Sequence, residues 1–89
     1  MRVEWRPEAR AELRAILEYI IERNVAAASD LNEAIEEATT ALPLHPYLYR
    51  LGKVSGTREI VVHPDYLVVY RVADWIEILT VLHARQEYP

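Results

Sequence analysis

The chain has 89 residues, of which 52% are hydrophobic and 27% are charged, and its formal net charge is −4 at pH 7. This length allows one domain with one core, and the composition is that of a folded chain rather than a disordered one. Because the sequence contains no cysteine, a disulfide framework and a thiolate metal site are both excluded.

The N-terminal residues Met1–Arg6 are rich in charge and lack the apolar segment of a signal peptide. No apolar run approaches the roughly 20 residues that a membrane-spanning helix needs. We therefore expect a soluble, cytoplasmic protein that makes no contact with a membrane.

The charge is distributed unevenly along the chain. Residues 1–42 carry five arginines and nine acidic residues, whereas residues 43–89 carry five basic and five acidic ones. Within the second half, residues 44–58 hold Arg50, Lys53 and Arg58 without any acid. This pattern predicts an acidic helical layer that supports a locally basic loop and sheet edge. An acidic chain gains little from bulk attraction to RNA, which draws on clustered Lys and Arg.

The first quarter of the chain predicts a short strand followed by a helix. In residues 2–5, Val3 and Trp5 alternate with polar residues, as in a half-buried strand. Pro7 suits the first turn of a helix, where its missing N–H is not needed, and Glu8 favours the positive end of the helix dipole. Asn24 is a suitable helix stop. Between these signals, apolar residues recur at helical spacing: Ala9, Leu13, Ile16, Leu17, Ile20 and Ile21.

A second helix is predicted over residues 26–42, ending before Pro43, because the residue that precedes a proline is pushed out of helical geometry. A short connection makes the two helices an antiparallel hairpin. We expect this hairpin to cover one face of a sheet. Its core residues should be Leu13, Ile16, Leu17, Ile20, Leu31 and Ile35.

The second half of the chain predicts a loop over residues 44–55 and three strands over residues 57–63, 66–72 and 76–82. Pro64-Asp65 and residues 73–75 supply the turns between the strands, and such short connections require an antiparallel meander. The strand at residues 2–5 should add to one edge of this sheet. The side chains of the last strand are expected to alternate between the two faces of the sheet. Ile76, Ile78, Thr80 and Leu82 form one set, and Glu77, Leu79 and Val81 form the other. The predicted fold class is α+β, with one domain over residues 1–89.

Three histidines, His45, His63 and His83, are the candidates for acid–base chemistry because the unperturbed histidine pKa lies near neutrality. They are not spaced as metal ligands on one element, so we expect no metal and no cofactor. His83 stands out because it lies where the last strand gives way to a polar tail that contains Arg85 and Tyr88. A surface histidine is the competing interpretation.

The order of these elements resembles the RelE/ParE family, the small toxins of bacterial type II toxin–antitoxin pairs. The resemblance rests on Gly56-Thr57-Arg58-Glu59 at the start of a strand, on the Leu67-Val68-Val69-Tyr70-Arg71-Val72 strand, and on the strand at residues 76–82 that runs into the polar tail. It covers essentially the whole chain. It implies a cognate antitoxin as partner, with homo- or hetero-oligomers allowed, and a target that is either DNA gyrase or the ribosome with its mRNA.

The nuclease branch of this family resembles the chain only in part. RelE-like members present an arginine at the start of the central strand, where this chain has Leu67, and another nuclease branch has a histidine near the position of Val61. Asp65, which follows Pro64 in a turn, matches that second branch. If the chain is a nuclease, the resemblance makes His83, Arg85 and Tyr88 its catalytic residues.

ParE-like members, by this resemblance, bind gyrase and lack the catalytic set, so Leu67 and the acidic charge favour that branch. Whether the chain is an enzyme stays open. The target-binding candidates are Arg58, Arg71, His83 and Arg85. The alternative is that Arg58 pairs with Glu59 or Glu77, and that Arg71 only lies on the solvated sheet face. A third interpretation is an inactive member of the family that retains only antitoxin binding. In each case the antitoxin should cover apolar surface on the hairpin and at the sheet edge.

Overall fold

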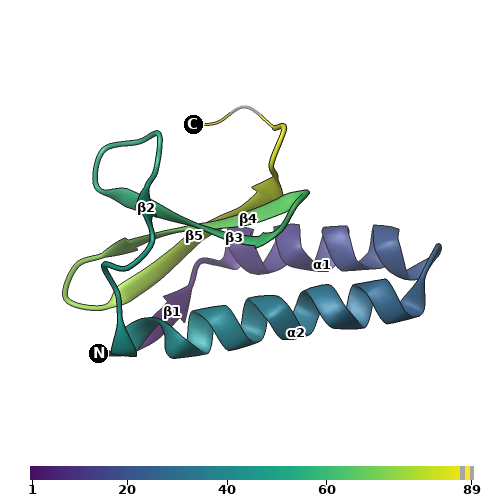
Figure 1. Ribbon diagram of the computed structural model, residues 1–89, viewed down its shortest axis with the longest axis horizontal. Coiled ribbons are helices and arrows are strands. Elements are labelled where there is room, and N and C mark those ends of the chain that lie inside the picture. Colours follow the sequence, from purple (N-terminus) through teal and green to yellow (C-terminus); the bar gives the residue numbers. More distant parts are fainter. Residues whose placement is uncertain (87, 89) are drawn as a thin grey trace.

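The computed structural model describes residues 1–86 and 88, and it contains the predicted strand, two helices and three-stranded meander in the predicted order, with one further short strand before the meander (Figure 1). Two helices lie together on one side of a five-stranded sheet, and none of the described residues forms a helix on the other face. The fold class is α+β, as predicted. In chain order the elements are β1 (Val3–Trp5), α1 (Pro7–Ile21), α2 (Val25–Ala41), a 3-10 turn (Leu42–Leu44), β2 (Arg50–Leu51), β3 (Thr57–His63), β4 (Tyr66–Val72) and β5 (Ile76–His83).

The helical hairpin follows its sequence signals closely. Pro7 is the first residue of α1, where no intrahelical partner for its nitrogen is required. Asn24 lies between the helices, and its side chain caps α2 by accepting a 3.0 Å hydrogen bond from the backbone N–H of Ala27. The predicted helix stop is thus also the start signal of the next helix. No helix of residues 1–86 combines the length and hydropathy needed to cross a bilayer.

The sheet has the order β1-β5-β4-β3-β2, and its centre is the predicted antiparallel meander of β3, β4 and β5. β1 joins the edge as expected, and it runs parallel to β5 with Val3 opposite Ile76. β2 was not predicted, because residues 44–55 were interpreted as a loop. It pairs only with Arg58 and Glu59, and two residues are too few to produce a periodic pattern.

The main core lies between the hairpin and the sheet, where α1 packs against β5 and α2 packs against β3. Three of the predicted core residues, Leu13, Leu31 and Ile35, are buried. Ile16, Leu17 and Ile20 are half-buried and pack on the margin of the same cluster. A second, smaller cluster lies on the helix-free face of the sheet, and it contains Leu67, Val69 and Leu82, with Leu79 and Tyr88 packed against them.

A β-bulge in β5 changes the predicted alternation of that strand. Val69 of β4 lies opposite Thr80, but the next residue, Tyr70, lies opposite Ile78, so Leu79 is an extra residue in β5. Ile78 belongs to the helix-side core as expected. Beyond the bulge, Val81 packs in that core and Leu82 lies in the opposite cluster. The prediction that Ile78 and Leu82 share one face is therefore wrong, because the inserted residue reverses the alternation.

Candidate functional site

The helix-free face of the sheet carries Arg71, one of the predicted binding residues. Arg71 on β4 lies opposite Glu77 on β5, and its Nε and Nη2 each approach Glu77 Oε1 to 2.8 Å. Arg6 Nε lies 3.5 Å from the other oxygen of the same carboxylate. The side chain of Arg71 remains 51% exposed. It can therefore contact a partner, but its charge is already shared with an acid.

A second ion pair on this face joins Arg50 of β2 to Glu59 of β3, with Nε 2.8 Å from Oε1. The alternative interpretation for Arg58, a pair with Glu59 or Glu77, is wrong, because these carboxylates are bound by Arg50 and Arg71.

Arg58 itself holds the loop that leads to β2. Its Nη1 donates to the backbone carbonyls of Tyr47 and Tyr49, at 3.1 and 2.8 Å. The neighbouring Tyr70 hydroxyl donates to the carbonyl of Pro46 at 2.7 Å. Burial raises the pKa of Tyr70 above its ordinary value of 10.0, and the nearby Arg58 charge opposes that rise. Both side chains thus fix a loop that the charge pattern had identified as basic.

The centre of the helix-free face is apolar. Leu67, at the position where the resemblance implies a cation in the nuclease branch, is 4% exposed and packs with Val69 and Leu82. Tyr88 of the tail packs against this cluster. The backbone N–H of Lys53 lies 3.5 Å from the Tyr88 hydroxyl, and its Nζ lies 5.3 Å from the ring centroid. The tail and the loop between β2 and β3 both extend on this side of the sheet (Figure 1).

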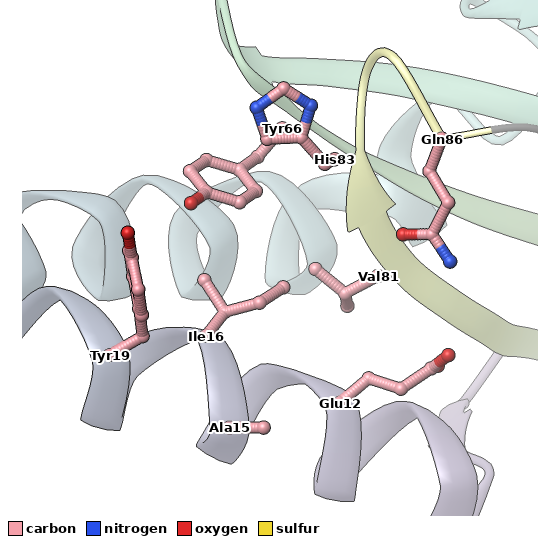
Figure 2. Close-up of a pocket in the computed structure, with 8 residues that line it drawn as sticks. All are labelled: Glu12, Ala15, Ile16, Tyr19, Tyr66, Val81, His83 and Gln86. Atoms are coloured by element: carbon pink, nitrogen blue, oxygen red, sulfur yellow. The ribbon is translucent and has the colours of Figure 1, made fainter.

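His83 lies on the other side, in an open cavity of about 360 Å³ between α1 and the end of the meander (Figure 2). Its ring meets that of Tyr66 edge to face, with 5.4 Å between the centroids. Its Nδ1 accepts a 3.1 Å hydrogen bond from the backbone N–H of Arg85. Glu12 of α1 lines the same cavity, and its carboxylate accepts a 2.8 Å bond from the Thr80 hydroxyl.

The predicted catalytic set is therefore divided. His83 faces the α1 side, Tyr88 packs on the helix-free face, and Arg85 lies exposed in the turn that follows β5. Two residues around His83 were not identified from the sequence: Tyr66, whose ring meets that of His83, and Glu12, which lines the same cavity. Glu12 is a polar position in an amphipathic helix, and nothing in the sequence signals its contact with a residue 68 positions away. Across residues 1–86 and 88, no group of three or more metal-ligating side chains forms a metal site.

The comparison with protein families now identifies the chain. The model described as "ParE toxin of type II toxin-antitoxin system, parDE" matches residues 3–88. This chain belongs to the ParE toxin family. As a member it is the toxin component of a type II pair, and the family implies a cognate antitoxin as its partner.

Two curated relatives agree with the ParE-family assignment. "Putative toxin Y4kP" of Sinorhizobium fredii is 36% identical over 89 residues, which cover 99% of this chain and 93% of the relative. "Toxin RelE2" of Caulobacter vibrioides is 35% identical over 83 residues, which cover 92% of this chain and 93% of the relative. The predicted resemblance to RelE/ParE toxins is thereby confirmed.

Solved structures share the fold of this ParE-family chain. A chain of the "Chromosomal ParDE TA system from P. aeruginosa" superposes with a TM-score of 0.80 at 23% identity, covering 93% of this chain and 95% of that one. The "YoeB/ParE toxin from Agrobacterium tumefaciens" has a TM-score of 0.69 at 15% identity, with 99% and 100% covered. Both likenesses concern the fold alone.

Proposed function

We propose that this ParE-family toxin acts by binding DNA gyrase, without a chemical step, and that its cognate antitoxin neutralises it. The main support is Leu67, which is buried in an apolar cluster at the point where the nuclease branch presents a cation. A leucine cannot bind phosphate or stabilise the charge that develops on it during cleavage.

The placement of the other groups also supports a binding mode. Cleavage of RNA at a 2′-hydroxyl needs a base, a cation for the phosphate and an acid for the leaving oxygen. Such groups act when their heavy atom lies within about 2.6–3.2 Å of the atom that gives or receives the proton. His83 and Tyr88 pack on opposite sides of the sheet, and Arg71 is tied to Glu77. One substrate phosphate cannot contact both His83 and Tyr88 in this arrangement.

The contacts proposed for gyrase lie at two ends of the meander: Arg71 is beside the β4–β5 turn on the helix-free face, and His83 and Arg85 are at the far end of β5. Arg71 is half-exposed, and Arg85 is exposed beside the His83 ring. The side chains of Arg71, His83 and Arg85 are proposed to contact gyrase directly. Arg58 is proposed to contribute indirectly, because it fixes the loop at Tyr47–Tyr49.

The test compares two targets with the same purified toxin. In a supercoiling reaction, we expect the toxin to inhibit gyrase and to leave cleaved DNA. Arg71→Ala and Arg85→Ala should weaken inhibition, whereas Arg14→Ala on the exposed side of α1 should not. In a translating ribosome system, we expect intact mRNA. Gyrase activity that is unchanged at toxin concentrations that arrest cell growth would contradict the proposal.

An endoribonuclease is the second candidate, and two observations favour it. One relative at 35% identity is named a RelE toxin. In addition, His83 and Glu12 line the same cavity (Figure 2), and the cation Arg85 follows His83 in the chain and donates its backbone N–H to the His83 ring. Reproducible cuts in the A-site codon that disappear in His83→Ala or Arg85→Ala would establish this second function in place of the first.

A further inference from the structure

The cavity between α1 and the end of the meander combines apolar side chains with polar groups in its wall (Figure 2). Ala15, Ile16 and Val81 form the apolar part of a lining around about 360 Å³. In Figure 2, the carboxylate of Glu12 and the amide of Gln86 lie on one side of Ile16 and Val81, and two tyrosine hydroxyls lie on the other. This volume is within the range of small-ligand pockets, so it can admit one long side chain of a partner.

Glu12 is the acid among the described residues that line the cavity, and no Lys or Arg lines it. Its Oε1 accepts a 2.8 Å hydrogen bond from the Thr80 hydroxyl, which fixes the carboxylate against β5. Within residues 1–86 and 88, no basic side chain lies within 4.0 Å of this carboxylate. An apolar occupant would take the charge out of water without compensation, and an acidic occupant would repel it. The cavity therefore favours a basic side chain.

The nearby Arg23 shows how a basic side chain is held beside this cavity. Its Cζ lies 3.8 Å from the centroid of the Tyr19 ring, and its Nη1 donates to the Tyr19 carbonyl at 2.8 Å. Arg23 thereby uses its charge at Tyr19 and at Glu22, 3.9 Å away, and it leaves Glu12 to a partner. The methylene stem of an incoming Lys or Arg can lie over Ile16, as such stems do on apolar surface.

His83 offers a hydrogen-bond donor at the rim of the cavity. Its Nδ1 accepts the backbone N–H of Arg85 at 3.1 Å. A neutral imidazole has one donor and one acceptor nitrogen, so the proton of the neutral ring is on Nε2. Figure 2 shows the ring nitrogens on the side that faces away from Ile16. The Nε2–H group can therefore donate to the backbone of a partner segment that passes over the cavity.

We propose that this cavity binds a Lys or Arg side chain of the target protein. The stem of that side chain lies over Ile16 and Val81, and its cationic head pairs with Glu12. The backbone carbonyl of the same residue accepts a hydrogen bond from His83 Nε2. The inference rests on the proposed function for the source of the side chain, because the cavity opens beside His83 and Arg85, which are proposed to contact the target.

The first test needs no target protein. Nα-acetyl-arginine amide is titrated into the isotope-labelled toxin, and Nα-acetyl-citrulline amide serves as the uncharged probe of the same shape. We expect the arginine probe to shift the amide signals of Glu12, Tyr66 and His83, and the citrulline probe to leave them unchanged. Equal shifts with both probes, or no shift at these three residues, would overturn the site.

Two variants show whether the carboxylate is responsible. Glu12→Gln should abolish the shifts caused by the arginine probe, although its amide oxygen can still accept the Thr80 hydroxyl. Glu18→Gln removes the same charge from an exposed site of α1 and should preserve the shifts. The same result in both variants would refute a specific role for Glu12.

The second test is inhibition of supercoiling by gyrase. Glu12→Gln should raise the toxin concentration that gives half-inhibition by about ten-fold, because the basic residue of the target loses its carboxylate. Glu18→Gln should change it by less than about two-fold. Unmodified toxin that binds the arginine probe and leaves gyrase uninhibited would support the cavity and overturn the gyrase target. Glu12→Gln that inhibits gyrase fully but binds the antitoxin more weakly would make the antitoxin the occupant and overturn the assignment to the target.

Discussion

Arg50 and Glu59 form an ion pair whose two members differ strongly in exposure. Their closest atoms are 2.8 Å apart, and the arginine side chain is 60% exposed while the glutamate is 7% exposed. Arg50 is half of the two-residue strand β2, so one exposed side chain compensates a carboxylate that is nearly removed from water. The shortest strand of the sheet is therefore important for the charge balance of the helix-free face.

Arg50→Ala should lower the free energy of unfolding by about 1–3 kcal/mol, since it leaves the Glu59 carboxylate buried without its cation. Arg2→Ala is the matched control, because both members of its pair with Glu4 are at least half exposed, and it should cost less than about 1 kcal/mol. Urea denaturation measures both. Adding Glu59→Gln to Arg50→Ala should recover part of the loss, and a double variant no more stable than Arg50→Ala would argue against this explanation.

Arg58→Ala should release the loop before β2. The guanidinium donates to two carbonyls, and its loss is expected to cost about 1.5–3 kcal/mol and to speed amide exchange in residues 47–51. Arg58→Lys should recover only part of the lost stability and of the protection from exchange, because an ammonium lacks the planar donor geometry that binds both carbonyl oxygens. Exchange rates unchanged in both variants would show that the loop is held by other contacts.

Tyr70→Phe should change the response to alkaline pH. Because burial raises the pKa of Tyr70 above 10.0, the neutral phenol contributes its full stabilisation below that pH, and the contribution is lost as the pH rises through the folded-state pKa. The variant loses the hydrogen bond to Pro46, worth about 0.5–1.5 kcal/mol at neutral pH. Its stability should then decline less steeply above pH 10 than that of the wild type. Parallel profiles in thermal denaturation between pH 8 and pH 11 would contradict the prediction.

His83→Ala and Tyr88→Ala should leave cellular RNA profiles unchanged upon induction of the toxin. A binding toxin has no proton transfer to lose, whereas a nuclease would lose about 10²–10⁴-fold in cleavage when its acid or base is removed. Sequencing of mRNA 5′ ends after induction measures this directly. Cleavage sites that are present with the unmodified toxin and absent in His83→Ala would favour the nuclease.

The helices and long strands could be predicted because their apolar residues repeat with the period of the element over several turns or pleats. β2 has two residues and therefore no period. The bulge at Leu79 depends on how β5 pairs with β4, a relationship that the sequence of one strand does not contain. The same limit explains the error for Arg58, since the choice between carboxylates and loop carbonyls depends on the path of the loop.

The sequence by itself determined the order of elements, the α+β class and the family resemblance, because local periodicity and turn residues act over short distances along the chain. Tertiary structure alone decided which charged groups meet. It placed Glu12 and His83 in the walls of one cavity, packed Tyr88 on the cluster that contains Leu67, and separated His83 from Tyr88 by the sheet. Such contacts join residues that are distant in sequence, and their energies depend on burial and distance, which only the folded chain defines.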